Sequence, residues 1–198
     1  MMEKKIALVL LAAGDSRRFG SNKLLSSFNG KPMYRCLTDQ LAQLSESLFA
    51  RKILVTQYEE IAVDLGRQGY VVVRNTQSER GISHSIHLAL ENLPDEIDAV
   101  CFSVCDQPWL QGSTIEALLR GWQTSGRGIG CLSCQGRTGN PVVFSRKYFS
   151  QLLSLIGDVG GKVVMKKHLE DVFFYKINNK KELLDIDKNT CHKDMDSL

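Results

Sequence analysis

The sequence carries little excess charge of either sign and has no long apolar run. Its 25 lysines and arginines stand against 22 aspartates and glutamates, a formal net charge of +3, whereas a surface that binds duplex nucleic acid is usually far more basic. The longest apolar run, residues 6–13, is much shorter than the roughly 20 residues of a membrane-spanning helix, and no cleavage pattern of a secretion signal follows it. We therefore expect a cytoplasmic protein that binds no nucleic acid and no membrane.

The six cysteines provide neither a disulfide framework nor a complete zinc site. Cys131 and Cys134 have the spacing of half a zinc site, yet no second cysteine or histidine pair follows that would complete four ligands. None of the four histidines has ligand spacing with a partner. Without a secretion signal, we expect the cysteines to be reduced, structural and buried.

The chain also lacks internal repeats, low-complexity tracts and a long polar spacer. Domains usually run to about 100–200 residues, and a composition of 43% hydrophobic and 24% charged residues is that of an ordinary globular domain. The sequence therefore predicts one domain over residues 1–187, followed by a charged tail over residues 188–198.

Short apolar runs alternate with stretches of helical periodicity through most of the chain. The runs that are typical of buried strands are residues 5–12, 52–56, 70–74, 99–104 and 141–144. Between them, apolar side chains recur every three or four positions, as at Met33, Leu37 and Leu41, at Ile82, Ile86 and Leu90, and at Ile115, Leu119 and Trp122. This alternation predicts a single three-layer α/β/α domain with a mainly parallel, Rossmann-like sheet, because parallel strands need crossover helices.

Local signals refine the later part of the chain. Ser113 and Glu116 have the spacing of a capping box, which predicts a helix that begins at Ser113. Residues 146–155 and 162–168 are predicted to form short helices, and residues 172–176 a further strand.

The loop after the first strand is suited to an anionic ligand. Residues 11–23 read LAAGDSRRFGSNK, and small residues let backbone N–H groups approach a phosphate chain while arginine and lysine supply charged donors. The glycine spacing matches neither a P-loop nor a dinucleotide-binding fingerprint. From these residues alone, a surface loop with solvated charges is an equal alternative.

A carboxylate follows the fourth predicted strand. Asp106 lies two residues beyond the apolar run 99–104, and in open α/β sheets ligands bind where the strands end. A carboxylate at that edge, facing a basic loop, is placed to hold a divalent cation on phosphate oxygens. The alternative is an aspartate that forms a turn before Pro108.

These two segments resemble the MobA-like nucleotidyltransferase superfamily, through the pattern LAAGxSxRxGxxK and the DxP of Asp106 and Pro108. Further motifs of that superfamily follow in order: NxxxxxGxSxS from Asn75, GNP from Gly139, GDxG from Gly157, and DID at residues 185–187. The set most resembles the molybdenum cofactor cytidylyltransferase branch, which joins CMP to the terminal phosphate of molybdopterin for molybdenum hydroxylases. The resemblance implies Mg²⁺-dependent transfer from CTP with release of pyrophosphate.

The resemblance also implies roles for individual residues. Arg18 and Lys23 would neutralise the triphosphate and stabilise the departing pyrophosphate, and Asp106 would hold Mg²⁺ together with Asp185. These catalytic residues act by positioning and charge, so no general base is required. The nucleotide-binding set would be Leu11, Ala12, Ala13, Gly14, Arg18, Lys23, Asn75, Gly81 and Ser85.

The acceptor half of the site is less sharply defined by the motifs. Asn140 would bind the acceptor through its amide, although it also fits a turn before Pro141. Asp158 would shape the acceptor loop, although an aspartate between glycines is equally typical of a plain turn. Ser83 fits a helix cap at least as well as a nucleotide contact.

Two motif details bear on the metal and the base. The family usually continues its DxD motif with Thr-Pro-acidic, whereas here Asp187 is followed by Lys-Asn-Thr, so that either Asp185 or Asp187 fits the second metal ligand. In the family an AAG start accompanies CTP and a GG start accompanies GTP, and the methyl group of Ala13 would narrow the space for a purine. The Ala-Ala-Gly of residues 12–14 therefore predicts CTP.

Two other functions compete with cytidylyl transfer to molybdopterin. One is nucleotidyl transfer to another phosphorylated acceptor such as a sugar phosphate, because the acceptor half of such sites is carried by variable loops. The other is a non-catalytic accessory protein that holds or delivers the cofactor to a molybdenum hydroxylase. The presence of Arg18, Lys23 and Asp106 together favours the enzymes.

Overall fold

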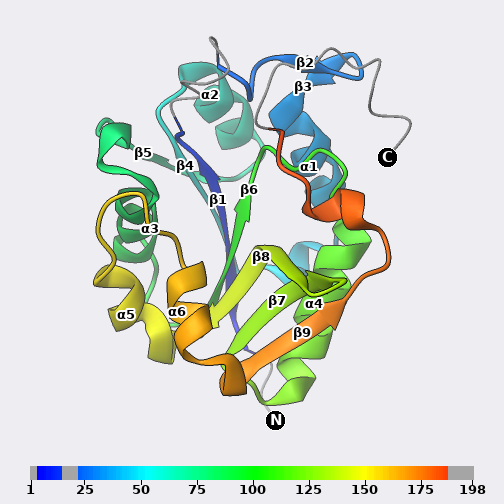
Figure 1. Cartoon of the computed structure of the whole chain (residues 1–198). Coiled ribbons are helices and arrows are strands. Elements are labelled where there is room, and N and C mark those ends of the chain that lie inside the picture. Colours follow the sequence, from blue (N-terminus) through cyan, green and yellow to red (C-terminus); the bar gives the residue numbers. More distant parts are fainter. Residues whose placement is uncertain (1–3, 15–21, 187–198) are drawn as a thin grey trace.

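The computed structural model describes residues 4–14 and 22–186 of the chain. Its centre is a seven-stranded sheet with the strand order β5-β4-β1-β6-β8-β7-β9 (Figure 1). The strands are β1 Ile6–Ala12, β4 Arg51–Thr56, β5 Val71–Arg74, β6 Ala99–Val104, β7 Ile129–Cys134, β8 Arg137–Ser145 and β9 Val172–Lys176. A small hairpin of β2 Ser27–Phe28 and β3 Lys31–Pro32 stands apart from this sheet.

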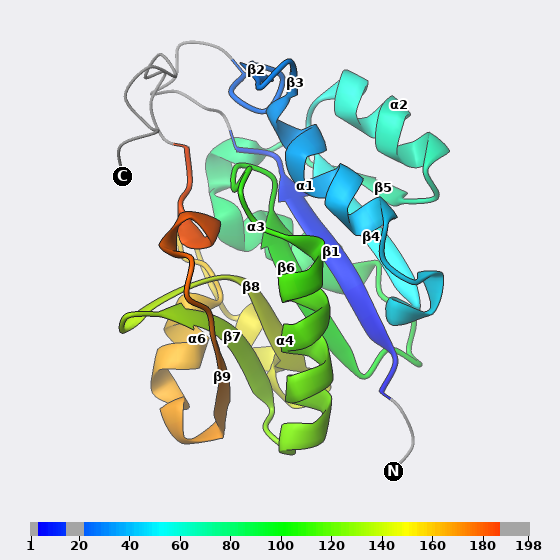
Figure 2. The same ribbon diagram turned by 90° about the vertical axis from the view of Figure 1, so that its right-hand side faces the viewer.

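Helices cover both faces of the sheet (Figures 1 and 2). They are α1 Met33–Ala42, α2 Glu59–Arg67, α3 Ile82–Glu91, α4 Gly112–Ser125, α5 Phe149–Leu153 and α6 Lys162–Lys167. Within the described ranges, none of them is long and apolar enough to cross a membrane.

Two core clusters lie on opposite faces of the sheet. Successive side chains of a strand point to opposite faces, and along β1 the residues Ile6, Leu8 and Leu10 belong to one cluster while Ala7 and Val9 belong to the other. The first cluster packs against α1, α2 and α4, and the second against α3, α5 and α6. The predicted three-layer α/β/α fold with a mainly parallel sheet is therefore confirmed.

Strand β8 runs antiparallel to its neighbours, and the adjacent strand β7 was not predicted from the sequence. β1, β4, β5 and β6 are mutually parallel, whereas β8 is antiparallel to both β6 and β7. A two-residue turn at Gln135 and Gly136, with φ of 49° and 79°, joins β7 to β8 in the manner of a type I′ hairpin. Strand β7 contains Gly130, where a Cβ atom would lie 3.0 Å from the Trp122 ring of α4, so glycine there serves close packing.

The capping-box prediction for α4 was wrong. The helix begins at Gly112 with Gln111 as its N-cap, and no side chain caps it locally. Instead, the Gln111 N–H donates to Glu182 Oε2 at 3.2 Å and the Gly112 N–H donates to Gln40 Oε1 at 3.3 Å. Distant segments thus satisfy the free N–H groups of the first turn, and Ser113 is left inside the helix.

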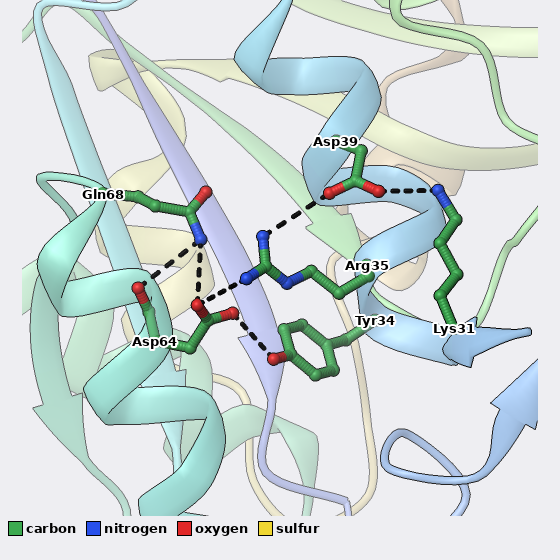
Figure 3. A network of polar contacts seen from close by, with 6 residues as sticks. All are labelled: Lys31, Tyr34, Arg35, Asp39, Asp64 and Gln68. Carbon is green, nitrogen blue, oxygen red and sulfur yellow. Dashed lines mark hydrogen bonds and ion pairs between the residues drawn. The ribbon is translucent and has the colours of Figure 1, made fainter.

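A polar network fastens α1 to α2 (Figure 3). Asp64 of α2 accepts hydrogen bonds from the Tyr34 hydroxyl at 2.7 Å and from the Arg35 guanidinium at 2.6 Å. Burial, together with the neighbouring Asp64, raises the pKa of Tyr34 to about 12, so that the phenol stays a neutral donor. These helices follow the loops after β1 and β4, and the network therefore holds those two loops in a fixed relation.

A second network fixes the opposite end of the sheet. Asp171, just before β9, accepts from the Gly128 N–H at 3.1 Å, from the Tyr148 hydroxyl at 2.6 Å and from Lys147 Nζ at 2.7 Å. Burial alone would raise the pKa of Asp171, but the hydrogen bonds from Lys147, Tyr148 and Gly128 outweigh it and lower the pKa to about 2.

Asp171→Asn is expected to destabilise the fold in a pH-dependent way. The folded pKa of Asp171 lies below the unfolded value of about 3.9, so its contribution is full above pH ~4 and disappears as the pH falls to ~2. Urea unfolding should show a loss of about 2 kcal/mol at pH 7 that shrinks over this acid window. The exposed Asp95 serves as the matched control, since Asp95→Asn should leave stability unchanged. A loss that stayed constant from pH 7 to pH 2 would contradict this role of the carboxylate.

The cysteines among the described residues are all buried and free. Burial raises the pKa of Cys101 to about 12 and that of Cys131 to about 11, so both are neutral thiols near pH 7. A thiol is a weaker metal ligand and nucleophile than a thiolate. The expectation of reduced, buried cysteines is met for these five residues, and Cys191 lies outside the described residues.

Candidate active site

The candidate site lies where β1 and β6 end side by side (Figure 1). Leu11 of β1 pairs with Val104 of β6, so the loops that follow these strands begin next to each other. Lys23 from the first loop places its Nζ 2.5 Å from Asp106 Oδ2 of the second. The basic loop and the carboxylate that the sequence singled out are thus brought together across 83 positions. Arg18, from the same loop as Lys23, lies outside the described residues.

The Asp106 carboxylate has one engaged and one unengaged oxygen. Side chains of Lys23 and Asp106 are only 18% and 17% exposed, so their attraction is weakly screened by water. Oδ2 faces the lysine, whereas Oδ1 is buried and has no hydrogen-bond partner among the described residues. A buried carboxylate oxygen without a donor is energetically costly, and a cation would satisfy it.

The donor set fits a divalent cation that is shared with a substrate. Among residues 4–14 and 22–186, no three histidine, cysteine, aspartate or glutamate side chains form a cluster that could hold a metal alone. Mg²⁺ commonly binds one or two carboxylates and takes its other ligands from substrate phosphates and water. Asp106, with its unengaged oxygen, is suited to that kind of site.

The C-terminal segment is tied to the Asp106 loop. The Ile186 N–H donates to the Asp106 carbonyl at 3.0 Å, and Lys23 Nζ donates to the Ile186 carbonyl at 3.3 Å. Gln107 Nε2 donates to Asp185 Oδ1 at 2.7 Å. These contacts bring Asp185 to the same edge of the sheet as Asp106, and its role as a metal ligand stays a prediction, while Asp187 lies outside the described residues.

The loop after β1 is braced by the loop after β4. The carbonyl of Ala12 accepts from Thr56 Oγ1 at 2.9 Å and that of Ala13 from Gln57 Nε2 at 2.8 Å. The Tyr58 hydroxyl donates to the Gly14 carbonyl at 2.6 Å. Because the carbonyls are held from this side, the opposite side of the loop is presented to a ligand in a fixed conformation.

Space is open at one end of this braced loop. Ala13 is buried, whereas Gly14 is exposed, and a Cβ atom built on Gly14 would meet nothing within 4 Å. A ligand can therefore approach the backbone at Gly14, as the sequence interpretation requires.

Asn75 and Ser85 are satisfied within the protein. Asn75 is fully buried, its Nδ2 donates to Ser85 Oγ at 2.9 Å, and its Oδ1 accepts from the Gln77 N–H at 2.9 Å. In this structure they fix the loop between β5 and α3, and their assignment to nucleotide binding stays a prediction. Ser83 does not cap α3, because the N-cap is Gly81.

Gly81 is required by close contact between two loops. Its φ is +85°, and a Cβ atom there would lie 2.4–2.6 Å from backbone atoms of Gly157 and Asp158. The Ser83 N–H also donates to the Gly157 carbonyl at 3.2 Å. The GDxG segment is thereby held against the start of α3, and the Asp158 side chain is exposed beside it.

A cavity of about 290 Å³ lies where β1 and β6 end, with Leu11 and Val104 in its wall. Its wall includes Leu11, Asn140 and Asp185, three of the residues predicted for nucleotide, acceptor and metal, and also Gln107, the neighbour of Asp106. The other predicted residues that the structure describes do not line it. These lie at the loop edge of Lys23 and Gly14, or around the start of α3 with Asn75 and Asp158.

Several lining residues were missed from the sequence. Ser103, Gln107, Thr138 and Lys162 also line the cavity, as do apolar residues on α3, α6 and the strands. Of these four residues, Gln107 alone lies inside a motif, the DxP of Asp106 and Pro108, which could have indicated a place in the site. The others become neighbours only when β6, β8 and α6 pack together.

Comparisons with known proteins agree with this geometry. Residues 8–172 match the family described as the MobA-like NTP transferase domain. A probable molybdenum cofactor guanylyltransferase of Bacillus licheniformis is 29% identical over 112 residues, which is 57% of this chain and 54% of that relative. The chain aligns with between about a quarter and about half of the length of the curated relatives it matches.

Solved structures share the fold over nearly the whole chain. Rv0371c from Mycobacterium tuberculosis H37Rv superposes with a TM-score of 0.76 at 24% identity, covering 93% of this chain and 94% of that one. A complex of Rv0371C with manganese superposes with a TM-score of 0.72 at 22% identity, covering 89% and 90% of the two chains. At this level of identity the likeness concerns the fold.

Proposed function

The chain belongs to the MobA-like NTP transferase family and is a nucleotidyltransferase, and we propose that it transfers CMP from CTP to the terminal phosphate of molybdopterin with release of pyrophosphate. The observation that carries the proposal is the Lys23–Asp106 pair, whose second carboxylate oxygen has no hydrogen-bond partner within residues 4–14 and 22–186. It lies at the edge of the sheet where ligands of open α/β folds bind. The product would serve a molybdenum hydroxylase.

Lys23 and Asp106 have different electrostatic roles in the proposed reaction. When the triphosphate binds, the Lys23 ammonium leaves Asp106 and pairs with phosphate oxygens. It then stabilises the negative charge that develops on the departing pyrophosphate. Asp106, joined by Asp185, would hold the divalent cation, for which we propose Mg²⁺. The bound cation would supply Lewis-acid stabilisation of the phosphate oxygens.

The attacking group is the acceptor's own phosphate. A phosphate oxygen is already ionised near pH 7, so no side chain has to remove a proton from it. The protein then acts by alignment: the loop at Ala13 and Gly14 fixes the nucleotide, and the wall that includes Asn140 fixes the acceptor for in-line attack on the α-phosphorus. The bond to pyrophosphate breaks as the new phosphoanhydride forms, with no covalent enzyme intermediate.

The proposal is tested with purified full-length protein, Mg²⁺, each of the four NTPs and molybdopterin, by measuring pyrophosphate release. We expect release with CTP that depends on molybdopterin. Release that needs a sugar phosphate instead, or tight CTP binding without any release in the presence of molybdopterin, would overturn the proposed acceptor.

Ala13→Gly is expected to relax the preference for CTP. Ala13 is buried directly after β1, and its carbonyl accepts a hydrogen bond from Gln57. Removal of its methyl group widens the space for the nucleotide base and makes the backbone of the loop more flexible. The ratio of kcat/KM for GTP to that for CTP should rise about tenfold. Ala12→Gly, one residue earlier in the chain, is the matched control, because it tests the effect of a more flexible backbone alone. An unchanged ratio would show that Ala13 does not select the base.

A further inference from the structure

The cavity beside Asp106 is formed where two strands separate. The β6–β8 ladder runs from Ala99–Ser145 to Phe102–Val142 and stops there. Beyond that point, Ser103 and Val104 on one strand and Gly139 and Asn140 on the other line the cavity. The apolar part of its lining comes mainly from the core cluster on the α3 and α6 face of the sheet.

Gln107 presents a hydrogen-bond acceptor at this gap. It is 2% exposed, and its Nε2 faces Asp185 Oδ1 at 2.7 Å. An ionised carboxylate only accepts hydrogen bonds, so the amide must turn its NH₂ group toward Asp185 and its oxygen away. That oxygen, Oε1, is buried and has no hydrogen-bond partner among the described residues.

Ser103 adds a hydroxyl to the same cavity. It is fully buried, and within the part of the chain that the structure describes its Oγ atom has no hydrogen-bond partner. Buried polar groups are nearly always satisfied in folded proteins. Two polar atoms without partners among the described residues, both on lining residues of one cavity, therefore point to a ligand that supplies an N–H to Gln107 and an acceptor to Ser103.

Much of the remaining wall is apolar, beside the polar residues Thr138, Asn140, Lys162 and Asp185, and the cavity is small. Ile82, Ile86, Phe102, Phe144 and Met165 contribute to it, which suits the faces of a flat ring. Its volume of about 290 Å³ lies at the lower end of the roughly 300–1,000 Å³ of small-molecule sites. It can take one ring system, while a phosphate tail extends toward neighbouring Asp106.

We infer that this cavity binds the pterin ring of the acceptor, with Gln107 Oε1 accepting from a ring N–H and the Ser103 hydroxyl donating to the ring carbonyl. The inference rests on the proposed function, because molybdopterin is the acceptor that carries such a ring. The amide-like edge of a pterin has an N–H next to a carbonyl, which matches the two unsatisfied atoms. Gln107 and Ser103 are therefore residues that select the acceptor.

Binding of free pterin to the nucleotide-free, full-length protein tests this assignment, with quenching of pterin fluorescence as the readout. Ser103→Ala should weaken binding about three- to tenfold, because it removes one hydrogen bond from a buried edge. Gln107→Met should weaken it about tenfold or more, because it removes both the acceptor for the ring and the donor that orients Asp185. Ser145→Ala is the matched control: its Oγ is also buried and unsatisfied among the described residues, but Ser145 lies at the far end of the same strand pair, opposite Ala99. It should bind pterin like the unchanged protein.

A parallel binding measurement with guanosine distinguishes the two kinds of ligand that carry this ring edge. Guanosine carries the same edge as pterin, so tighter, Ser103-dependent binding of guanosine would assign the cavity to a nucleotide base and overturn the acceptor assignment. Equal pterin affinity in Ser103→Ala, Gln107→Met and the unchanged protein would also overturn it.

Kinetics separate this inference from the proposed function. Ser103→Ala should raise KM for molybdopterin about three- to tenfold with KM for CTP unchanged. Pyrophosphate release with an unaltered KM for molybdopterin would leave the proposed function standing and refute the cavity assignment. Ser103-dependent pterin binding without any transfer would support the cavity and refute the transferase reaction.

Discussion

Asp106→Asn is expected to reduce nucleotidyl transfer by about a thousandfold or more. The exchange keeps the size of the side chain, and the asparagine oxygen would remain toward Lys23, since a lysine needs an acceptor. The NH₂ group would then replace the unengaged Oδ1 and present a donor where the divalent cation would bind. Lewis-acid stabilisation is worth several kcal/mol, and each 1.4 kcal/mol is about tenfold in rate.

The loss must be separated from a loss of folding. Urea unfolding should place Asp106→Asn within about 1 kcal/mol of the unchanged protein, because the hydrogen bond to Lys23 is retained. Asp95→Asn, an exposed aspartate at the other edge of the sheet, should keep full activity. A folded Asp106→Asn protein with substantial pyrophosphate release would exclude Asp106 as the metal ligand, and full biological function of Asp106→Ala would favour the non-catalytic accessory role.

Lys23→Met is expected to change catalysis and cation binding in opposite directions. Transfer should fall about 100- to 1,000-fold, as when a charged or polar donor to a developing anion is removed. In the nucleotide-free protein, however, Lys23 pairs with Asp106 at 2.5 Å, and its replacement removes the counter-charge that the described residues provide to this carboxylate. Affinity for Mn²⁺ alone should then rise about tenfold, because a neighbouring cation disfavours a second one by at least that amount.

Titration of Mn²⁺ by its electron paramagnetic resonance signal measures the second effect. Lys31→Met is a matched control. Lys31 forms an ion pair of comparable length with Asp39, with 2.6 Å between Nζ and Oδ2, and this pair is remote from the site. It should alter neither transfer nor Mn²⁺ binding. Weaker Mn²⁺ binding in Lys23→Met would contradict competition between the lysine and the cation for Asp106.

Most of the sheet could be predicted from the sequence because its strands are continuous apolar runs. Strands buried on both faces have near-continuous apolar runs, which makes β1, β4 and β6 easy to recognise. β7 escaped prediction because its glycine, serine and cysteines weaken the apolar pattern. The glycine is explained by the Trp122 ring, from which a Cβ atom at Gly130 would lie only 3.0 Å away.

The start of α4 was mispredicted for a related reason. A capping box is a local pattern, and Ser113 with Glu116 satisfies it. The N–H groups at this helix start are instead bonded by Gln40 and Glu182, which lie 72 and 71 positions away. Tertiary acceptors replaced the local cap, and no local pattern can reveal them.

The candidate site divides in the same way. The sequence by itself determined the α/β class, the basic loop after the first strand and the carboxylate at Asp106, because each depends on residue types adjacent in the chain. The packing of the sheet brings Lys23 to Asp106 and Asp185 to Gln107. It also leaves Ser103 and Gln107 at a cavity with atoms that have no partner in the described part of the chain. The physical reason is that such contacts depend on strand order and on where the β6–β8 ladder ends, which are properties of the packed sheet rather than of any one segment.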